Sequence, residues 1–204
     1  MNPGQENSDG QQLRDDFASD ASLADYQPLS PDAAAQPWQL LAGKLLGPPL
    51  ATYLGGSHYL ARRGYDDHGS LRMTAQVTPA NGESFGLAFR VQDATHLYRF
   101  VNAERDNQQR LERVDGATVT VLASNSAPAR TGSGPRLFTV EADGVRLRVF
   151  QGHAAPILQT EDATYPAGTV AFYSQGSYPR FDDLAITPFD PRGDACDQIG
   201  RAHV

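Results

Sequence analysis

The chain has 204 residues, of which 40% are hydrophobic and 20% charged, so it is long enough to bury one substantial core. Its formal net charge of −7 disfavours a nucleic-acid-binding surface, which requires clustered positive charge. The sequence contains no run of about 18 apolar residues, so no membrane-spanning helix is predicted.

The two ends of the chain differ in composition from its middle. Residues 1–12 are rich in Gln, Asn, Gly and Ser and are predicted to be a disordered leader or linker, not a signal peptide. Residues 189–204 are predicted to be a tail, and 199–204 resemble the translated read-through of a sequencing adapter. Lys44 is the only lysine among many arginines and alanines, a bias typical of GC-rich bacterial genes. We therefore expect a single domain over 13–188, cut from a longer bacterial protein.

The elements expected after the leader are almost all short strands. An acidic and aromatic run, 13–17, opens the domain, and a short helical turn is expected around Ser22 to Tyr26. From Trp38 onward, strand-like and turn-like segments alternate. The expected strands are 38–42, 45–46, 51–54, 58–62, 70–78, 84–92, 96–103, 109–114, 118–123, 136–142, 145–150, 169–174 and 180–187.

The pattern within these segments indicates the fold class. Apolar and polar residues alternate with period two in 70–78 and 84–92, as in half-buried strands. The pairs Asp115-Gly116 and Asp143-Gly144 predict hairpin turns, because Gly and Asp tolerate positive φ. The sequence shows neither a long helical pattern nor an internal repeat. It therefore predicts an all-β protein in which two antiparallel sheets stack as a sandwich.

Matching runs at the two ends of the domain predict how the sandwich closes. The opening run Leu13-Arg14-Asp15-Asp16-Phe17 and the closing run 181–186, which begins Phe-Asp-Asp, are both acidic and aromatic. Because the two runs share this composition, they suggest two strands of the same sheet. We therefore expect the first and last strands to lie side by side.

The order of several short motifs resembles that of the concanavalin A-like lectin/glucanase superfamily, the laminin G-like jelly roll, in bacterial members near the 3-keto-disaccharide hydrolase-like domains. The resembling motifs are Asp15-Asp16-Phe17, Trp38 followed by Gly43-Lys44-Leu45, 65–71, 86–90, 98–100, 168–174 and Phe181-Asp182-Asp183. The resemblance implies an antiparallel two-sheet jelly-roll sandwich. The superfamily contains lectins, binding modules, glycoside hydrolases and lyases, so the resemblance implies a fold more than an activity.

Four aspartates are the candidate metal ligands. If the first and last strands are neighbours, Asp15 and Asp16 approach Asp182 and Asp183 at one sheet edge. Ca²⁺ accepts several carboxylate and carbonyl oxygens, and jelly-roll carbohydrate modules often carry a structural calcium between these strands, so a structural Ca²⁺ is expected here. The alternative is that these aspartates are solvated charges or accept backbone N–H bonds. Side chains alternate along a strand, so only one of each pair is expected to share a site.

A second set of candidates lies on the central strands. Phe85, Leu87 and Phe89 are expected to point inward, which places Arg90 on the opposite face of its strand. The following strands then bring Arg99 or Tyr98, and next Arg110 and Glu112, beside it. The candidate ligand-binding residues here are Arg90, Tyr98, Arg99, Arg110 and Glu112. They suit sugar hydroxyls or a uronate, and the alternative is a ladder of cross-strand salt bridges.

Tyr59 and Tyr65 complete the predicted ligand-binding set. They belong to a polar and aromatic stretch, 53–68, that is expected to border the sheet face, where sugars stack on tyrosine rings. The alternative is that both are edge aromatics without a ligand.

The sequence supports catalysis less well than binding. Glu104 and Asp106, and likewise Glu141 and Asp143, have the spacing of paired glycosidase carboxylates, but each pair runs into a turn. We therefore predict a non-catalytic carbohydrate-binding or adhesion module of a larger exported bacterial protein, located outside the cell or on its surface. Its expected partners are a polysaccharide or glycan and covalently linked neighbouring domains. The alternative is a glycoside hydrolase or related polysaccharide-active enzyme of the same fold.

Overall fold

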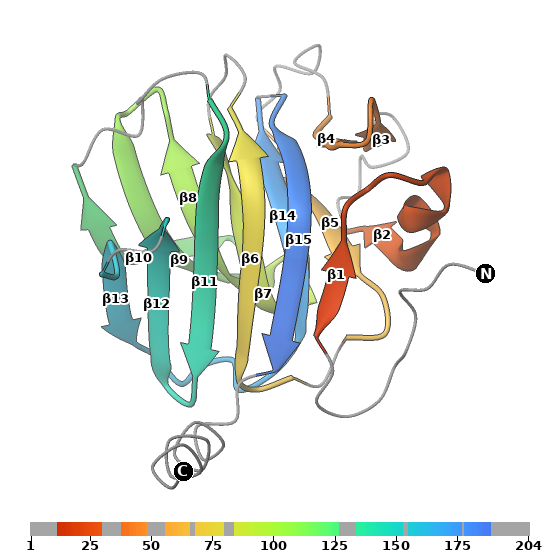
Figure 1. Ribbon diagram of the computed structural model, residues 1–204. Coiled ribbons are helices and arrows are strands. Elements are labelled where there is room, and N and C mark those ends of the chain that lie inside the picture. Colours follow the sequence, from red (N-terminus) through yellow and green to blue (C-terminus); the bar gives the residue numbers. More distant parts are fainter. Residues whose placement is uncertain are drawn as a thin grey trace, which may run out of the picture.

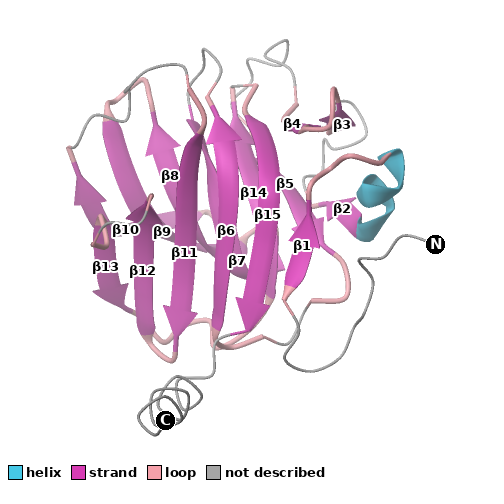
Figure 2. Cartoon of the chain, viewed as in Figure 1, coloured by secondary structure: helices cyan, strands magenta, loops and turns pink. Residues whose placement is uncertain are grey.

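The computed structural model describes residues 12–29, 38–48, 56–65, 68–79, 84–126, 134–152, 155–176 and 178–188. The expected leader except its last residue, the expected strand 51–54 and the tail 189–204 lie outside this part of the chain. Two antiparallel sheets pack face to face, and sheet A lies in front of sheet B in Figures 1 and 2. No helix in the described residues is long and apolar enough to cross a membrane.

Sheet A has eight strands, and its main path runs β13-β12-β11-β6-β15-β4-β3, with β1 added beside β15. In chain order these strands are β1 (Leu13–Asp15), β3 (Gln39–Leu40), β4 (Leu45–Leu46), β6 (Leu71–Thr78), β11 (Arg136–Asp143), β12 (Arg146–Gln151), β13 (Leu158–Glu161) and β15 (Arg180–Pro188). The neighbours in this sheet are often far apart in the chain, as in a jelly roll.

Sheet B has seven strands in the order β10-β9-β8-β7-β14-β5-β2. They are β2 (Tyr26–Pro28), β5 (His58–Arg62), β7 (Ser84–Asp93), β8 (His96–Ala103), β9 (Gln108–Asp115), β10 (Thr118–Asn125) and β14 (Thr169–Gln175). A short 3-10 helix, η1 (Asp20–Asp25), precedes β2. The strands β7 to β10 form a meander, and β14 inserts between β7 and β5.

Most strand predictions are confirmed, and the exceptions have local causes. Alternation in β6 places Leu71 and Met73 in the core, and the expected hairpins turn at Gly116 and Gly144, both with positive φ. β13 was not expected from the sequence, and η1 gives way to the short edge strand β2. Both β2 and β13 are edge strands of four residues or fewer, and their pairing with a neighbour defines them more than their own pattern does.

The first and last strands of the domain are neighbours, as the sequence predicted. β1 pairs with β15 antiparallel, with Leu13 opposite Ile186 and Asp15 opposite Leu184. Figure 1 shows the two strands side by side although they come from opposite ends of the sequence. Phe17 and Phe181 both contact Phe172 of the other sheet, with ring centroids 5.8 and 4.7 Å away, so the ends of the domain are joined through its core.

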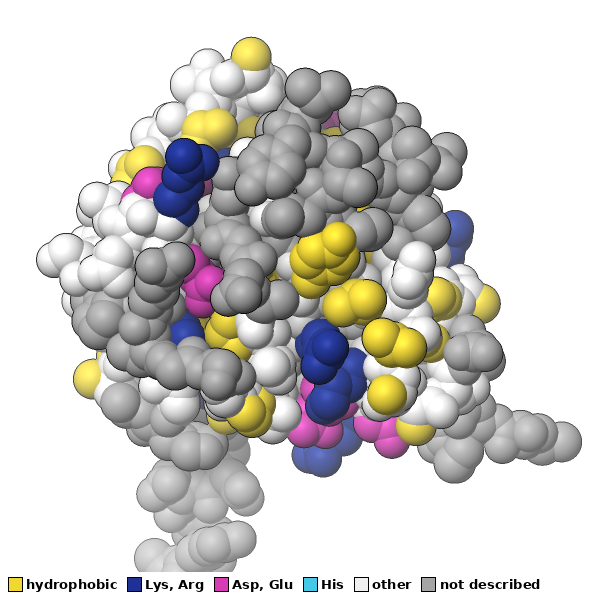
Figure 3. Space-filling view, turned by 90° about the horizontal axis from the view of Figure 1, so that it is seen from above, with side chains coloured by type: hydrophobic (Ala, Val, Ile, Leu, Met, Phe, Trp, Pro, Cys, Tyr) yellow, Lys and Arg dark blue, Asp and Glu magenta, His cyan; other side chains and the backbone are white. Residues whose placement is uncertain are grey.

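One apolar cluster lies on each face of sheet B. The main core fills the space between the sheets and contains most of the buried Phe, Leu, Ile and Val side chains. A second cluster lies on the other face of sheet B and includes Tyr59, Ala88, Val101 and Tyr173. We call this second surface the outer face. At the end of the sandwich seen in Figure 3, basic side chains of the described residues lie beside acidic ones.

Candidate functional site

The middle of the outer face is built from small residues. Ala61, Ala171 and Ala88 lie in one row across β5, β14 and β7, because each is the paired residue of the next. In the adjoining row Gly86 lies between Tyr173 and Val101. A Cβ on Gly86 would stand 1.7 Å from the carbonyl oxygen of Phe100. The short side chains leave room for long side chains to lie flat over the sheet.

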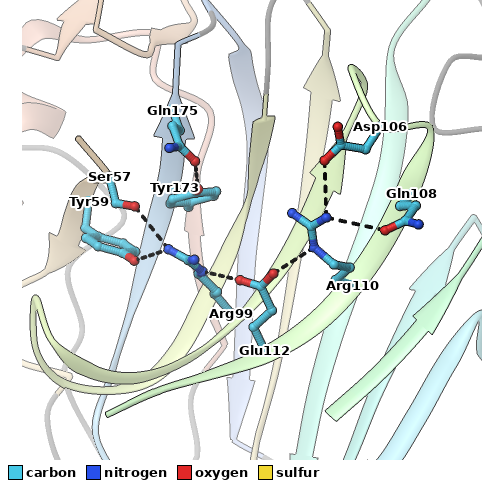
Figure 4. Close-up of polar contacts among 9 residues, drawn as sticks. All are labelled: Ser57, Tyr59, Arg99, Asp106, Gln108, Arg110, Glu112, Tyr173 and Gln175. Atoms are coloured by element: carbon cyan, nitrogen blue, oxygen red, sulfur yellow. Dashed lines mark hydrogen bonds and ion pairs between the residues drawn. The ribbon is translucent and has the colours of Figure 1, made fainter. Parts of the chain in front are cut away.

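Arg99 of β8 extends over this row of small residues and contacts residues on both sides of its own strand. Its Nε donates to Oε2 of Glu112 on β9, at 2.8 Å. Its Nη1 donates to the hydroxyls of Tyr59 and Ser57, at 2.7 and 3.1 Å. Its guanidinium carbon lies 4.7 Å from the ring centroid of Tyr173 on β14. Figure 4 shows the guanidinium between the two tyrosines and the carboxylate.

A second arginine shares the same carboxylate. Nε of Arg110 donates to Oε1 of Glu112 at 2.8 Å, so the two carboxylate oxygens receive bonds from two different guanidiniums. Nη1 of Arg110 lies 3.4 Å from oxygens of Asp106 and Gln108 at the surface. The network therefore leads from the buried Arg99 through Glu112 to the partly exposed Arg110 (Figure 4).

The electrostatics of the network keep the tyrosines neutral and the arginine charged. Burial raises the pKa of Tyr173 to about 12, although the nearby Arg99 acts to lower it. Burial also raises the pKa of Tyr59. For Arg99, burial acts to lower the pKa, but Tyr173, Tyr59 and Glu112 outweigh it and hold the pKa above its ordinary value. The network therefore presents a charged Arg99 guanidinium and neutral tyrosine hydroxyls at neutral pH.

Exposure increases across the outer face from the centre towards β10. The side chains of Arg99 and Glu112 are 10% and 4% exposed, whereas that of Arg110 is 23% exposed. Val119 and Val121 on β10 are 48% and 50% exposed, and they lie opposite Val114 and Glu112 of β9. A ligand approaching from solvent therefore meets Arg110 and the two valines first.

Arg90 lies elsewhere than strand alternation predicted. The pairing of β7 with β8 shifts register between Phe89 and Asp93, and Arg90 itself has a φ of +49°. This bulge turns the side chain away from the outer face. Arg90 is fully buried, and its guanidinium donates to the backbone carbonyls of Gly69, Gly144 and Tyr165. It joins loops of the sandwich and does not contact Arg99.

Tyr98 and Tyr65 also lie apart from the Arg99 network. Tyr98 points into the main core, where its ring stacks on Phe89 and its hydroxyl donates to Asp162. Tyr65 is buried in the same core beside His68. Of the seven ligand-binding candidates, the structure brings together Tyr59, Arg99, Arg110 and Glu112 and leaves Tyr65, Arg90 and Tyr98 outside the group.

The four candidate calcium ligands each have a protein partner. Asp15 accepts from the backbone N–H of Phe17 and from the hydroxyl of Tyr26, at 2.9 and 3.1 Å. Asp16 accepts from the N–H of Ala18, and Asp182 forms an ion pair with Lys44.

The fourth candidate, Asp183, lies 3.5 Å from the side-chain nitrogen of Gln76 and has a φ of +49° in a bulge. Among the described residues, no group of three or more His, Cys, Asp or Glu side chains is placed to hold a metal ion. The four carboxylates, as they lie here, do not fit a calcium site.

The glutamates of the two candidate catalytic pairs form ion pairs with arginines. Glu141 accepts from Nε of Arg72 at 2.6 Å and lies 2.9 Å from Nη2 of Arg148. Glu104 lies 3.9 Å from Nη2 of Arg136. These contacts hold both glutamates in ion pairs.

Sequence reasoning missed four members of the network: Ser57, Gln108, Tyr173 and Gln175. Gln175 accepts a bond from the hydroxyl of Tyr173 at 2.7 Å. The period-two pattern of 169–174 places Tyr173 on the face opposite Phe172, which was a usable signal. The adjacency of β14 and β7 was not visible in the sequence.

No family model matches the chain, and no curated protein is similar to it. Solved structures do share its fold. The carbohydrate-binding module CBM66 from Bacillus subtilis has a TM-score of 0.68 at 12% identity, over 80% of this chain and 95% of that one. The exoplasmic/lumenal domain of VIP36, in a form bound to Ca²⁺ and Man3GlcNAc, has a TM-score of 0.58 at 10% identity, over 83% of this chain and 87% of that one.

An enzyme is also among the similar structures. The GH43 protein BlXynB from Bacillus licheniformis has a TM-score of 0.64 at 14% identity, over 86% of this chain but only 39% of that one. At identities of 10–14%, these likenesses show the fold alone. The chain has the concanavalin A-like jelly-roll fold that its motifs predicted.

Proposed function

We propose that this protein is a non-catalytic carbohydrate-binding module and that glycans bind on the outer face of sheet B. The observation that carries the proposal is the convergence of Arg99, Glu112 and Arg110 with the hydroxyls of Tyr59 and Ser57 on that face. Sugar recognition needs several convergent donors and acceptors with fixed directions, and this network supplies them. The likeness to CBM66 and to the VIP36 domain bound to Man3GlcNAc supports the choice of ligand class.

The experiment is a binding screen on the full chain with a matched pair of variants. We expect one class of immobilised glycan to retain the protein and Arg110→Ala to weaken retention, because Arg110 is the network residue that solvent reaches. The control is Arg146→Ala, an exposed arginine on β12 of the other sheet. Equal retention of both variants would place binding elsewhere, and a lack of retention on every glycan would refute the function.

A polysaccharide-active enzyme is the second candidate function, and the likeness to the GH43 protein BlXynB favours it. Glu104 and Glu141 both form ion pairs with arginines, which supports the binding role instead. Prolonged incubation with each retained polysaccharide distinguishes the two. We expect no new reducing ends, and their release in proportion to protein concentration would establish the enzyme.

We also propose that the module acts outside the cell and is joined to further domains. The similar part of BlXynB is 39% of that chain, which supports a domain that occurs within larger proteins. Proteomics of the source cells tests this proposal. Finding the sequence in the secreted or surface fraction, within a polypeptide longer than this chain, is the expected result, and a purely cytoplasmic protein would contradict it.

The sequence also predicts a structural calcium ion. The VIP36 forms that bind Ca²⁺ support it, and the ion pair between Asp182 and Lys44 argues against it. Because the four carboxylates, as they lie here, do not fit a calcium site, we expect EDTA to leave the melting temperature unchanged. A ligand that binds only the folded state stabilises it by mass action, so a fall that added Ca²⁺ reverses would restore the calcium site.

A further inference from the structure

The buried charges of the outer-face network are unequal. Two guanidiniums, those of Arg99 and Arg110, share the single buried carboxylate of Glu112. The other carboxylate in contact is that of Asp106, which is largely exposed and 3.4 Å from Arg110, at the weak end of ion-pair distances. Tyr59 and Tyr173 are neutral at pH 7, so they add no negative charge. One positive charge of the network therefore lacks a buried counter-ion.

The network also has donors to spare. Arg99 uses Nε and Nη1, and Arg110 likewise uses Nε and Nη1. Within the described part of the chain, Nη2 of Arg99 and Nη2 of Arg110 have no hydrogen-bond partner. A guanidinium with one free terminal nitrogen, beside a carboxylate whose two oxygens already accept bonds, is suited to bind a second anion.

An apolar strip borders the charged end of the network. Val121 lies directly opposite Glu112, and Val119 lies opposite Val114, so both valines belong to the outer face. Both are about half exposed. Val121 therefore lies beside Glu112, whose Oε1 binds Arg110, so the two valines lie near a positive charge. A pyranose ring has an apolar C–H face and polar edges, so one ring can contact both areas at once.

We infer that the ligand of this site is an acidic saccharide, in which the carboxylate of a uronate residue binds the guanidinium of Arg110 and its ring lies against Val119 and Val121. This inference rests on the proposed carbohydrate-binding function and names its ligand class. The planar carboxylate matches the paired N–H donors of a guanidinium, whereas neutral hydroxyls would add no buried negative charge beside Arg110.

The test compares oligosaccharides that differ in charge, with binding measured by calorimetry on the full chain. The probes are an oligogalacturonide, its methyl ester, a neutral galactan oligosaccharide and a sulfated galactan oligosaccharide. We expect the oligogalacturonide to bind most tightly and methyl esterification to weaken binding about tenfold, as the loss of one charge-assisted hydrogen bond predicts. Binding should also weaken as NaCl is raised.

Variants connect the preference to the proposed residue. Arg110→Gln should lose about tenfold in affinity for the oligogalacturonide and little for its ester, because the charge interaction is absent from the ester. Arg146→Gln, the control on the other sheet, should bind like the parent protein. Equal melting temperatures of the variants would show that the change is not one of folding.

The possible failures are distinct. Equal or tighter binding of the neutral oligosaccharide would overturn the uronate inference and leave carbohydrate binding standing. Preference for the sulfated probe over the uronate would also overturn it, since sulfate would then be the recognised anion. A chain that binds none of these probes, and no glycan in the wider screen, would refute the proposed function itself.

Discussion

Replacing Glu112 by Gln tests whether the outer-face network is a buried ion network. Both oxygens of Glu112 accept an arginine Nε at 2.8 Å, and the side chain is 4% exposed. In Glu112→Gln, one oxygen becomes an NH₂ group, so one guanidinium faces a donor and both lose the counter-charge that Glu112 supplied.

Breaking a buried pair from one side costs about 3–5 kcal/mol. Arg110 can recover hydration because it is 23% exposed, whereas Arg99 at 10% cannot. The cost should therefore fall at the lower end, at about 3 kcal/mol.

The assay is urea unfolding followed by fluorescence and circular dichroism, with thermal unfolding beside it. In a domain of this size, each 1 kcal/mol lowers the melting temperature by about 2–4 °C, so a fall of roughly 6–12 °C is expected. Glu161→Gln, at an exposed position of β13, is the matched control and should change stability by less than about 0.5 kcal/mol.

A double-mutant cycle separates the pair from its surroundings. Arg99→Met and Glu112→Leu together should cost clearly less than the sum of the two single changes, because the double variant leaves neither partner of that pair as an uncompensated charge. A loss below about 1 kcal/mol for Glu112→Gln, or strict additivity in the cycle, would refute the reasoning.

Two further changes test the sheet and the loop beside it. Gly86→Ala places a Cβ 1.7 Å from the carbonyl oxygen of Phe100, so it should cost about 3 kcal/mol or more in chemical unfolding, while Gly134→Ala, with open space around it, should be near neutral. Burial acts to raise the pKa of Asp162, but bonds from Thr164, Tyr98 and Arg113 hold it below its ordinary 3.8. A depressed carboxyl pKa stabilises the fold above that ordinary value, and the gain is lost as pH falls through the lower folded value, so Asp162→Asn should flatten the acid loss of stability below about pH 4. An unchanged acid profile in this variant would show that Asp162 is not the titrating group.

Local pattern was enough to predict most of the strands and the closure of the sandwich. Period-two alternation assigned the inward faces of β6 and β7, and the Asp-Gly pairs marked two hairpins. The acidic and aromatic runs at both ends predicted that β1 pairs with β15. These features depend on neighbouring residues or on composition, so a sequence displays them directly.

Part of the candidate site was likewise predictable. β8 and β9 are joined by a short turn, so their register follows from the meander, and Arg99 comes opposite Glu112. The sequence left Tyr98 and Arg99 as alternatives for the shared face, and the structure selects Arg99. The phase of a strand is ambiguous until one residue is known to be buried, and here the packing of Tyr98 in the core decides it.

The sequence by itself determined an all-β sandwich with adjoining ends and a run of arginines and a glutamate on neighbouring strands. Only the tertiary structure decided which of them meet. A bulge after Phe89 removed Arg90 from the outer face, and pairing of β14 with both β7 and β5 brought Tyr173 and Tyr59 to Arg99. Bulges change the phase of every later side chain, and hydrogen bonds between strands distant in the chain carry no local signal, so neither can be read from neighbouring residues.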